Sequence, residues 1–318
     1  MAQVIARVMV DGDIHLSSKN YGGHIDYPQE TLYYAKLLID IFKNYAATHR
    51  INSGDFSYGR FSTLEYRLEV EKLLREMLEI SHGRYWIVKG NHDKANYGMT
   101  EYEYYLNSNL FKGSESLSIG KLHIHMRDYN DFTPIDTSED GTHVLITHGY
   151  FLFENSNLPD YGVATKLDNM KEWYGLDYIL CGHIHEEHII SGYISNGEGR
   201  SHPCTVHYLP CLSRPAYHGE DTPTVGSIDF IDVYDDGQVQ FNRLPINLLP
   251  IEQSFDIERI KKEKESKEVR RVDLSDVVNG LNNHEITVGN PEDVIMAKAN
   301  IPLKYREKAV ELLKSGLT

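Results

Sequence analysis

The fold of this chain is decided by the stretch Tyr85-Trp86-Ile87-Val88-Lys89-Gly90-Asn91-His92-Asp93. Its first four residues form a short apolar run, which is typical of a buried strand. Three polar side chains follow almost at once, in a place where burial is costly unless each group has a partner. A turn is the simplest explanation, because Asn, Asp and Gly all favour turns. A site for metal ions and phosphate is the alternative, and the rest of the chain decides between the two.

Two earlier stretches repeat this order of a buried strand followed by polar residues. Residues 4–10 lead into Asp11-Gly12-Asp13-Ile14-His15, and the short strand at 50–53 leads into Gly54-Asp55. Amphipathic helices are expected between these strands, at residues 29–45 and onward from a capping-box motif at residues 62–65. Alternating strands and helices predict a parallel sheet covered by helices. Ligands of such sheets gather beyond the carboxyl ends of the strands.

The second half of the chain is richer in strands. They are expected at residues 143–147, 177–181, 188–194, 205–209, 225–234 and 238–244. These strands either extend the parallel sheet with antiparallel members or form a second sheet packed on it. A hairpin is expected across Gly120-Lys121. His123 and His125 then lie on one face of a strand, where we expect them to face solvent.

Composition and charge limit the class of protein. The chain has 318 residues, 41% hydrophobic and 25% charged, which is ordinary for a globular protein. It has no apolar run of about 18 residues, so no membrane span is expected. The net charge of −15 argues against nonspecific adhesion to nucleic acid or to anionic membranes. It does not exclude DNA as a substrate, because bound divalent cations would neutralise part of the charge.

The cysteines and the N-terminus favour a cytoplasmic location. Cys181, Cys204 and Cys211 cannot all pair, and none lies in a CxxC motif. We expect them to be free and buried in a reducing compartment. The first residues run directly into a strand pattern and lack the apolar segment of a signal peptide.

The composition shifts near Pro250. Residues 257–271 mix basic and acidic side chains, which favours a solvated helix surface. Residues 294–313 have the pattern of one or two amphipathic helices. We therefore expect a catalytic domain at residues 1–248 and a cap or partner-docking region at residues 249–318.

Five short motifs at the ends of expected strands form a strong joint signal: Asp13-x-His15, Gly54-Asp55, Gly90-Asn91-His92-Asp93, His148-Gly149 and Gly182-His183-x-His185. Hydrolysis of a phosphate ester needs an activated nucleophile and stabilisation of developing charge. Two divalent metals about 3.5–4 Å apart meet both needs. Carboxylates and imidazoles are suitable ligands. An Asp and a His two apart on an extended segment point to the same side and can share a metal.

These motifs resemble the D-x-H, G-D-x-x-D, G-N-H-D/E, strand-end H and G-H-x-H motifs of the calcineurin-like metallophosphoesterase superfamily, over roughly residues 4–245. The resemblance implies a four-layer α/β/β/α sandwich. It assigns to the first metal Asp13, His15, Asp55 and His185. It assigns to the second metal a bridging Asp55, Asn91, His148 and His183. It makes His92 the general acid or transition-state donor, oriented by Asp93.

Two motifs depart from the family pattern. Phe56, Ser57 and Tyr58 follow Asp55, so the second acidic group of G-D-x-x-D is absent. This change is expected to tune His15 or the loop rather than to abolish metal binding. Tyr150 follows His148-Gly149, where some members carry a second histidine, and a substrate contact is expected to differ there.

Within the superfamily the chain most resembles the SbcD-type DNA repair nucleases and their phage counterparts. The similarity rests on the Asp-x-His motif, the long first loop, and Val206–Arg214, which resembles their strand and G-S/T-P loop without its glycine. It implies a DNA exo/endonuclease in which a metal-bound hydroxide attacks and His92 is the acid. The implied metals are two divalent ions, Mn²⁺ foremost, with Fe, Zn or Mg as alternatives. The candidate substrate contacts are Arg214, Tyr217 and His218.

Partners and alternative functions follow from the same resemblance. The C-terminal region is expected to dock an SMC-like ATPase or a second copy of the chain. A phosphodiesterase or phosphatase of cyclic nucleotides, nucleotides or RNA ends is the first alternative, mildly favoured by the acidic charge. A metal-binding scaffold without activity is the second, and the intact His92 argues against it.

Overall fold

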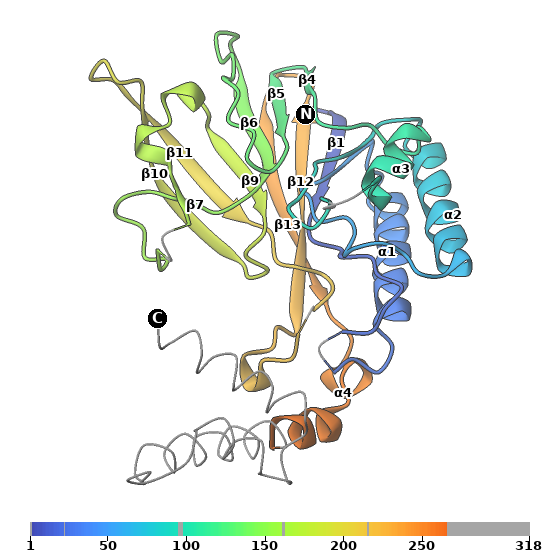
Figure 1. The fold of residues 1–318 in the computed structure, drawn as a ribbon. Coiled ribbons are helices and arrows are strands. Elements are labelled where there is room, and N and C mark those ends of the chain that lie inside the picture. Colours follow the sequence, from blue (N-terminus) through green and yellow to red (C-terminus); the bar gives the residue numbers. More distant parts are fainter. Residues whose placement is uncertain (1, 22, 95–97, 161–162, 215, 266–318) are drawn as a thin grey trace, which may run out of the picture. The chain divides into compact units, whose positions relative to one another are not determined.

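The computed structural model (Figure 1) describes residues 2–21, 23–94, 98–160, 163–214 and 216–265. The chain divides into two compact units, Met1–Ile257 and Glu258–Thr318, and each is described by itself. Residues 258–265 are the described part of the second unit, and they are helical.

Part of the expected C-terminal organisation lies outside the described residues. This holds for the helices expected at 294–313 and for the end of the charged segment at 257–271. The expected boundary near residue 248 stays a prediction. Among the described residues, none belongs to a helix long and apolar enough to cross a membrane.

The first unit contains a five-stranded sheet in the order β13-β12-β1-β2-β3. Its strands are β1 (Val4–Asp11), β2 (His49–Asn52), β3 (Tyr85–Ile87), β12 (Val225–Tyr234) and β13 (Val239–Asn247). β1, β2 and β3 are parallel, as the alternation of strands and helices predicts. β12 joins antiparallel to β1, and β13 completes a hairpin with β12.

A second sheet has six strands in the order β10-β11-β9-β6-β5-β4. These strands are β4 (Ser116–Ile119), β5 (Leu122–Arg127), β6 (Thr142–His148), β9 (Tyr178–Gly182), β10 (His188–Ser195) and β11 (Ser201–Tyr208). Both arrangements left open by the sequence therefore occur. The last hairpin extends the first sheet, and the strands before it form a separate sheet.

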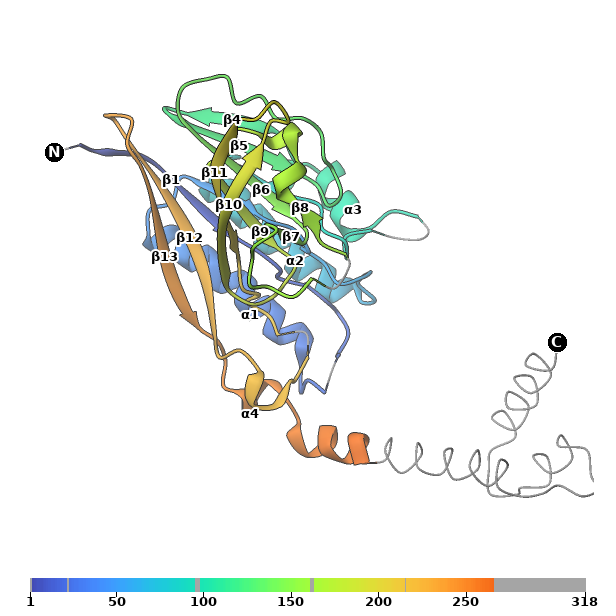
Figure 2. The same ribbon diagram turned by 90° about the vertical axis from the view of Figure 1, so that its left-hand side faces the viewer.

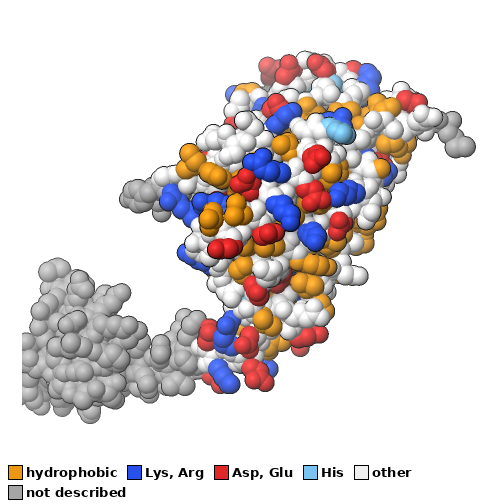
Figure 3. Space-filling model, turned by 90° about the vertical axis from the view of Figure 1, so that its right-hand side faces the viewer, with side chains coloured by type: hydrophobic (Ala, Val, Ile, Leu, Met, Phe, Trp, Pro, Cys, Tyr) orange, Lys and Arg blue, Asp and Glu red, His pale blue; other side chains and the backbone are white. Residues whose placement is uncertain are grey.

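Helices cover the outer face of the first sheet (Figure 1). They are α1 (Tyr27–Asn44), α2 (Leu64–Ile80) and α3 (Glu101–Asn107), and the short α4 (Ile251–Ser254) follows the last strand. The buried stripe of these helices packs on Met9 of β1 and Ile87 of β3. Figure 3 shows this helix-covered face, where acidic and basic side chains are interspersed rather than segregated by sign.

The helix caps differ in one place from the expected pattern. α2 begins after Thr63, whose hydroxyl accepts from the backbone N–H of Tyr66, so the N-cap is Thr63 rather than the Ser62 of the expected box. A complete capping box occurs instead at α3, where Thr100 and Glu103 bond each other's backbone N–H groups. Both caps satisfy N–H groups that the first turn of a helix leaves without partners.

Three hydrophobic cores separate four layers, which confirms the expected sandwich. Between the sheets, Val8 and Val10 of β1 meet Val144 and Ile146 of β6. On the far side of the second sheet, Trp173 packs on the sheet in a third core. This fourth layer consists of loops, the 3-10 helices η1 (Leu167–Asn169) and η2 (Lys171–Trp173), and a two-stranded sheet of β7 (Phe151–Leu152) and β8 (Thr165–Lys166). Figure 2 looks onto the molecule from this side.

Three histidines of the second sheet stack on one another. The ring of His143 lies 4.7 Å from that of His123 and 5.5 Å from that of His125, with nearly parallel planes. All three are less than 10% exposed, so the expectation that His123 and His125 face solvent is wrong. The reason is a loop over this face, whose carbonyl oxygens at Glu139 and Asp140 lie 2.9 Å from His143 Nε2 and 3.4 Å from His123 Nε2.

Candidate metal centre

The candidate ligands lie where parallel strands of both sheets end. Asp13 and His15 follow β1. Their segment runs beside the segment that follows β2, because the N–H of Asp13 donates to the Gly54 carbonyl and the N–H of His15 donates to the Asp55 carbonyl. The backbone N–H of His183, after β9, donates to Asp13 Oδ2 at 2.8 Å. This bond joins the ends of the two sheets.

Four residues that the resemblance assigns to the first metal converge on one point. Asp13, His15, Asp55 and His185 each offer a ligand atom, and these atoms lie within 4.8 Å of one another. His15 Nε2 and His185 Nε2 are 3.0 Å apart, and Asp55 Oδ2 lies 3.9 Å from His15 Nε2. Two imidazole nitrogens and two carboxylates directed at one point form a suitable site for a divalent cation.

The residues assigned to the second metal form an adjoining group. Asn91 Oδ1 lies 2.9 Å from both His148 Nε2 and His183 Nδ1. His148 Nε2 is also 3.2 Å from Asp55 Oδ2, so Asp55 is shared by the two groups. A carboxylate between two ligand groups suits the bridging position of a two-metal site.

Unsatisfied buried atoms show that these residues fit metal ions. Asp13 and Asp55 are at most 1% exposed. Asp13 Oδ1, Asp55 Oδ2 and His15 Nδ1 are buried without a hydrogen-bond partner, although the first two lie 3.5 and 3.2 Å from nitrogens of His148. Buried carboxylate oxygens without donors are costly unless an ion neutralises their charge.

The sequence matches a family model for calcineurin-like phosphoesterases over residues 6–187. The chain belongs to this family. A search of curated proteins finds no match. Among solved structures, the fold is similar to that of a dimetal phosphatase from Danio rerio, with 9% identity, a TM-score of 0.45, and coverage of 78% of this chain and 100% of the other. Vps29 from Chaetomium thermophilum is similar with 10% identity, a TM-score of 0.35, and coverage of 77% and 100%.

The electrostatics of this phosphoesterase site centre on His148 and two carboxylates. Burial raises the pKa of Asp13 to about 7, with the charge of His148 opposing it. Burial acts in the same direction on Asp55, but the close approach and charge of His148 outweigh it and hold its pKa below the ordinary range. Burial lowers the pKa of His183 and of His185 to about 4. Neutral imidazoles of this kind are the form that binds metals.

The backbone at the site is held in an unusual conformation. Five candidate ligands have positive φ: Asp13 (45°), His15 (51°), Asp55 (50°), His183 (107°) and His185 (65°). Each such residue costs on the order of 1–3 kcal/mol, a strain that clusters at functional sites. Left-handed residues, rather than the alternation of an extended segment, therefore bring Asp13 and His15 to one metal position.

Gly90 allows the loop after β3 to approach Asp55. A Cβ atom at Gly90 would lie 2.1 Å from Asp55 Oδ1 and 2.2 Å from the Asp55 backbone nitrogen. No larger residue fits there without moving the shared carboxylate. Gly90 is thus needed for close approach of two backbones.

His92 lies beside the ligands, but Asp93 does not orient it. The His92 ring is half-buried at 5.3 Å from the His15 ring, and its backbone N–H donates to Asp55 Oδ1 at 2.9 Å. Asp93 is fully buried and instead accepts bonds from the backbone of Gly90, Phe56 and Ser57 and from the Ser57 hydroxyl. The expectation that Asp93 orients His92 is wrong, because its oxygens tie two loops together.

Two tyrosines at the site were not predicted as functional residues. The Tyr58 ring lies 4.6 Å from the His92 ring at 33°, in the position where the family pattern has its second acidic group. Tyr129 lies about equally far from His148 and His183, at 6.1 and 6.0 Å. The Lys94 ammonium lies 4.6 Å over the Tyr129 ring. The missing acidic group at Tyr58 was the one sequence signal for either residue.

Arg214 is placed away from solvent, against its expected role as a substrate contact. It is 2% exposed, and its guanidinium donates to the Leu249 carbonyl at 2.6 Å and to Ser254 Oγ at 2.5 Å. The Arg214 guanidinium therefore binds acceptors inside the fold. Tyr217 is half-buried against Phe255, and His218 is exposed, so their role stays a prediction.

Proposed function

We propose that this chain is a metal-dependent phosphodiesterase that cleaves DNA, as an exo/endonuclease of the SbcD type. One observation supports this most. Ligand residues from two sheets converge at one edge of the sandwich, with a half-buried histidine beside them. The ligand residues are Asp13, His15, Asp55, Asn91, His148, His183 and His185, and the half-buried histidine is His92.

The chain's own residues divide the work. Asp13, His15, Asp55 and His185 would hold one metal, and Asp55, Asn91, His148 and His183 the other. Bound there, two divalent metals supply an activated water and charge stabilisation for the phosphoryl oxygens. Nitrogen and oxygen ligands of this kind suit Mn²⁺ as well as Fe²⁺ or Zn²⁺.

In the proposed reaction His92 donates a proton to the leaving group. His92 is half-buried, whereas His15 beside it is fully buried. A donor near the leaving oxygen lowers the barrier by protonating that oxygen as the P–O bond breaks. The backbone N–H of His92 donates to Asp55 Oδ1, and this hydrogen bond fixes the His92 backbone relative to the ligands.

Aromatic and basic groups at the edge of the site favour a nucleic-acid substrate. Tyr58 is half-buried beside His92 and Tyr129 is half-buried beside His183, and Lys94 is exposed beside Tyr129. Aromatic rings stack on bases and a lysine attracts phosphate. We further propose that the C-terminal region, residues 249–318, docks a partner, which is an SMC-like ATPase or a second copy of the chain.

An assay of four substrates tests the proposal. Purified protein with Mn²⁺ is given single-stranded DNA, double-stranded DNA, a bis-aryl phosphodiester and cyclic nucleotides. The proposal expects cleavage of DNA that chelation abolishes. Cleavage of the small diesters with both DNAs intact would instead support the small-molecule phosphodiesterase, which the net charge of −15 favours mildly. No hydrolysis of any substrate by metal-loaded protein would leave a scaffold role.

A further inference from the structure

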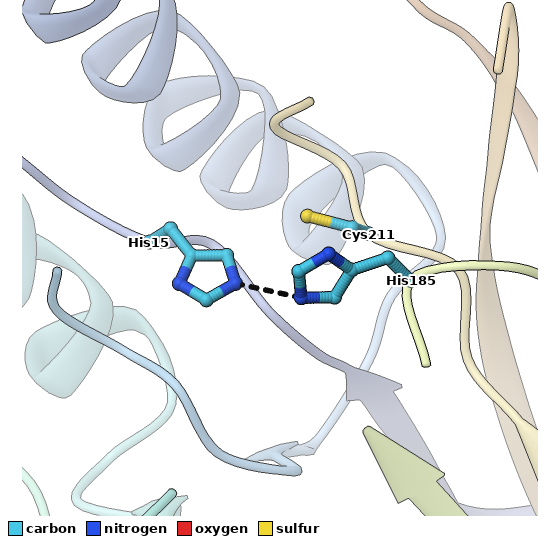
Figure 4. A group of neighbouring side chains, drawn as sticks. All are labelled: His15, His185 and Cys211. Carbon is cyan, nitrogen blue, oxygen red and sulfur yellow. Dashed lines mark hydrogen bonds between the residues drawn. The ribbon is translucent and has the colours of Figure 1, made fainter. Parts of the chain in front are cut away.

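Solvent reaches the candidate metal centre unevenly. In the first group of ligands His15 is buried, and the buried Cys211 lies beside both His15 and His185 (Figure 4). In the second group of ligands, Asn91 and His183 are both half-buried. A substrate therefore has access to the second group, and the side chains around Asn91 and His183 are the ones that a bound strand meets.

One aromatic ring lies beside this second group. The centroid of the Tyr129 ring is 6.0 Å from that of His183 and 6.1 Å from that of His148, and the Tyr129 side chain is half-buried. The Tyr129 N–H donates to the Lys89 carbonyl at 2.8 Å, directly before the loop that carries Asn91. Because the segment that supplies a ligand also holds Tyr129, the ring stays next to a phosphate bound there.

A lysine accompanies this ring. Lys94 directly follows the motif at residues 90–93, is exposed, and places its ammonium 4.6 Å from the centroid of the Tyr129 ring. The chain has a net charge of −15, so this cation supplies an attraction for phosphate that the chain as a whole does not. A cation–π contact at an exposed site is weak, so a base can replace the ammonium over the ring while the ammonium moves to a phosphate.

We propose that Tyr129 and Lys94 form a nucleotide subsite beside the second group of ligands, with a base stacked on Tyr129 and the adjoining phosphate bound by Lys94. The inference rests on the proposed function and names its preferred substrate. Stacking on a side chain requires a base whose face is free, whereas the bases inside a duplex are covered by their neighbours. The subsite therefore selects single-stranded DNA over duplex DNA.

Removal of the bases from the substrate tests the contact with Tyr129. The full chain with Mn²⁺ is given a thymidine oligonucleotide and an abasic oligonucleotide of the same length. Wild type should cleave the first with a kcat/KM at least about fivefold higher, which is the lower end of base–aromatic stacking. Tyr129→Ala should lose this preference, and Tyr129→Phe should keep it. Tyr193→Ala is the matched control and should keep it too, because Tyr193 is an exposed tyrosine of β10.

The salt dependence of binding tests the contact with Lys94. Binding of the thymidine oligonucleotide is measured by fluorescence anisotropy at several salt concentrations, in a His92→Ala background that cleaves slowly. Loss of one phosphate contact on a single strand lowers the slope of log Kd against log salt by about 0.7, and this change is expected for Lys94→Gln. Lys112→Gln is the control and should keep the slope, because the exposed Lys112 ammonium also lies over a ring, 4.7 Å from the centroid of Trp86.

Four results would overturn the inference: equal kcat/KM of wild type on the two oligonucleotides, a preference that survives in Tyr129→Ala, an unchanged slope in Lys94→Gln, or duplex DNA cleaved as fast as single strands. The comparison of substrates uses wild type alone, so it does not depend on the folding of a variant. Failure of the proposed function is distinguishable, because it would appear as intact DNA in every assay with the Lys94-dependent slope still present.

Discussion

Asp55 contacts more of the candidate metal centre than any other carboxylate described here. Its Oδ1 accepts from the backbone of His92, and its Oδ2 lies 3.2 Å from His148 and 3.9 Å from His15. We predict that Asp55→Asn loses metal and hydrolysis together, because the amide keeps the shape but removes the charge. Metal content per chain and turnover are measured, with Glu198→Gln, at an exposed turn, as the control. Full metal content in Asp55→Asn would rule out its bridging role.

His92 is expected to act on the leaving group rather than on the metals. We predict that His92→Ala keeps both metals and lowers DNA cleavage by about 10²–10⁴-fold, the usual contribution of a positioned acid. The loss should be smaller for a bis-aryl diester, because its leaving group needs less protonation. Steady-state rates on both substrates measure this difference. Unchanged DNA cleavage by the variant would refute the role.

Tyr58 is the side chain whose ring lies closest to that of His92 among the described contacts. The Tyr58 ring also packs on the Tyr21 ring, with 4.5 Å between the ring centroids. We predict that Tyr58→Phe keeps turnover, since the ring contact with His92 remains, and that Tyr58→Ala lowers kcat by roughly tenfold, a fraction of the acid contribution. Metal content should be unchanged in both variants. Equal losses in the two would mean that the hydroxyl, not the ring, matters.

At the scale of elements, strands β5 and β6 carry a pH-dependent feature in the histidine stack. Burial, then the charge of His143, lowers the pKa of His125 to about 4. An unfolded histidine has a pKa of about 6.5, so the unfolded chain binds an extra proton between these values. Stability should therefore be full above about pH 6.5 and fall as the pH decreases toward 4.

A urea titration at two pH values measures this effect. Between pH 7 and pH 5, the free energy of unfolding should fall by about 1 kcal/mol more in wild type than in His125→Asn. The exposed His218 provides a control in His218→Asn, which should follow wild type. Parallel pH curves for wild type and His125→Asn would contradict the prediction.

At the scale of the whole molecule, residues 249–255 are integrated into the first unit. The Leu249 N–H donates to Tyr34 Oη at 2.7 Å, and Leu249 and Ser254 accept from the buried Arg214. The Phe255 ring lies 4.2 Å from that of His24. The segment therefore supplies acceptors for a buried charge.

Two truncations separate this segment from the rest of the C-terminal region. A chain ending at residue 257 should keep the stability and diester hydrolysis of the full chain. A chain ending at residue 248 should be less stable by about 1–3 kcal/mol or more, because the Arg214 guanidinium loses two acceptors. Thermal unfolding and turnover are the measurements. Equal stability of both truncations would show that the contacts of residues 249–255 contribute little.

Much of the architecture was predictable because it is encoded locally. Alternating apolar runs and helical stripes predicted most strands and helices close to those observed, although the short strands β7 and β8 were not expected. The residue types and spacing of motifs such as Asp13-x-His15 indicated metal chemistry without knowledge of contacts. These properties depend on neighbours within a few residues, which a sequence displays directly.

Other properties depend on partners far apart in the chain. Asp93 binds backbone groups of Phe56 and Ser57 rather than the adjacent His92, and Arg214 is buried because acceptors arrive from residues 249 and 254. The approach of Cys211 to His15 spans almost 200 positions and needs both sheets to end at the same edge. Burial and contact at such distances follow from packing, for which the local pattern of side chains carries no signal.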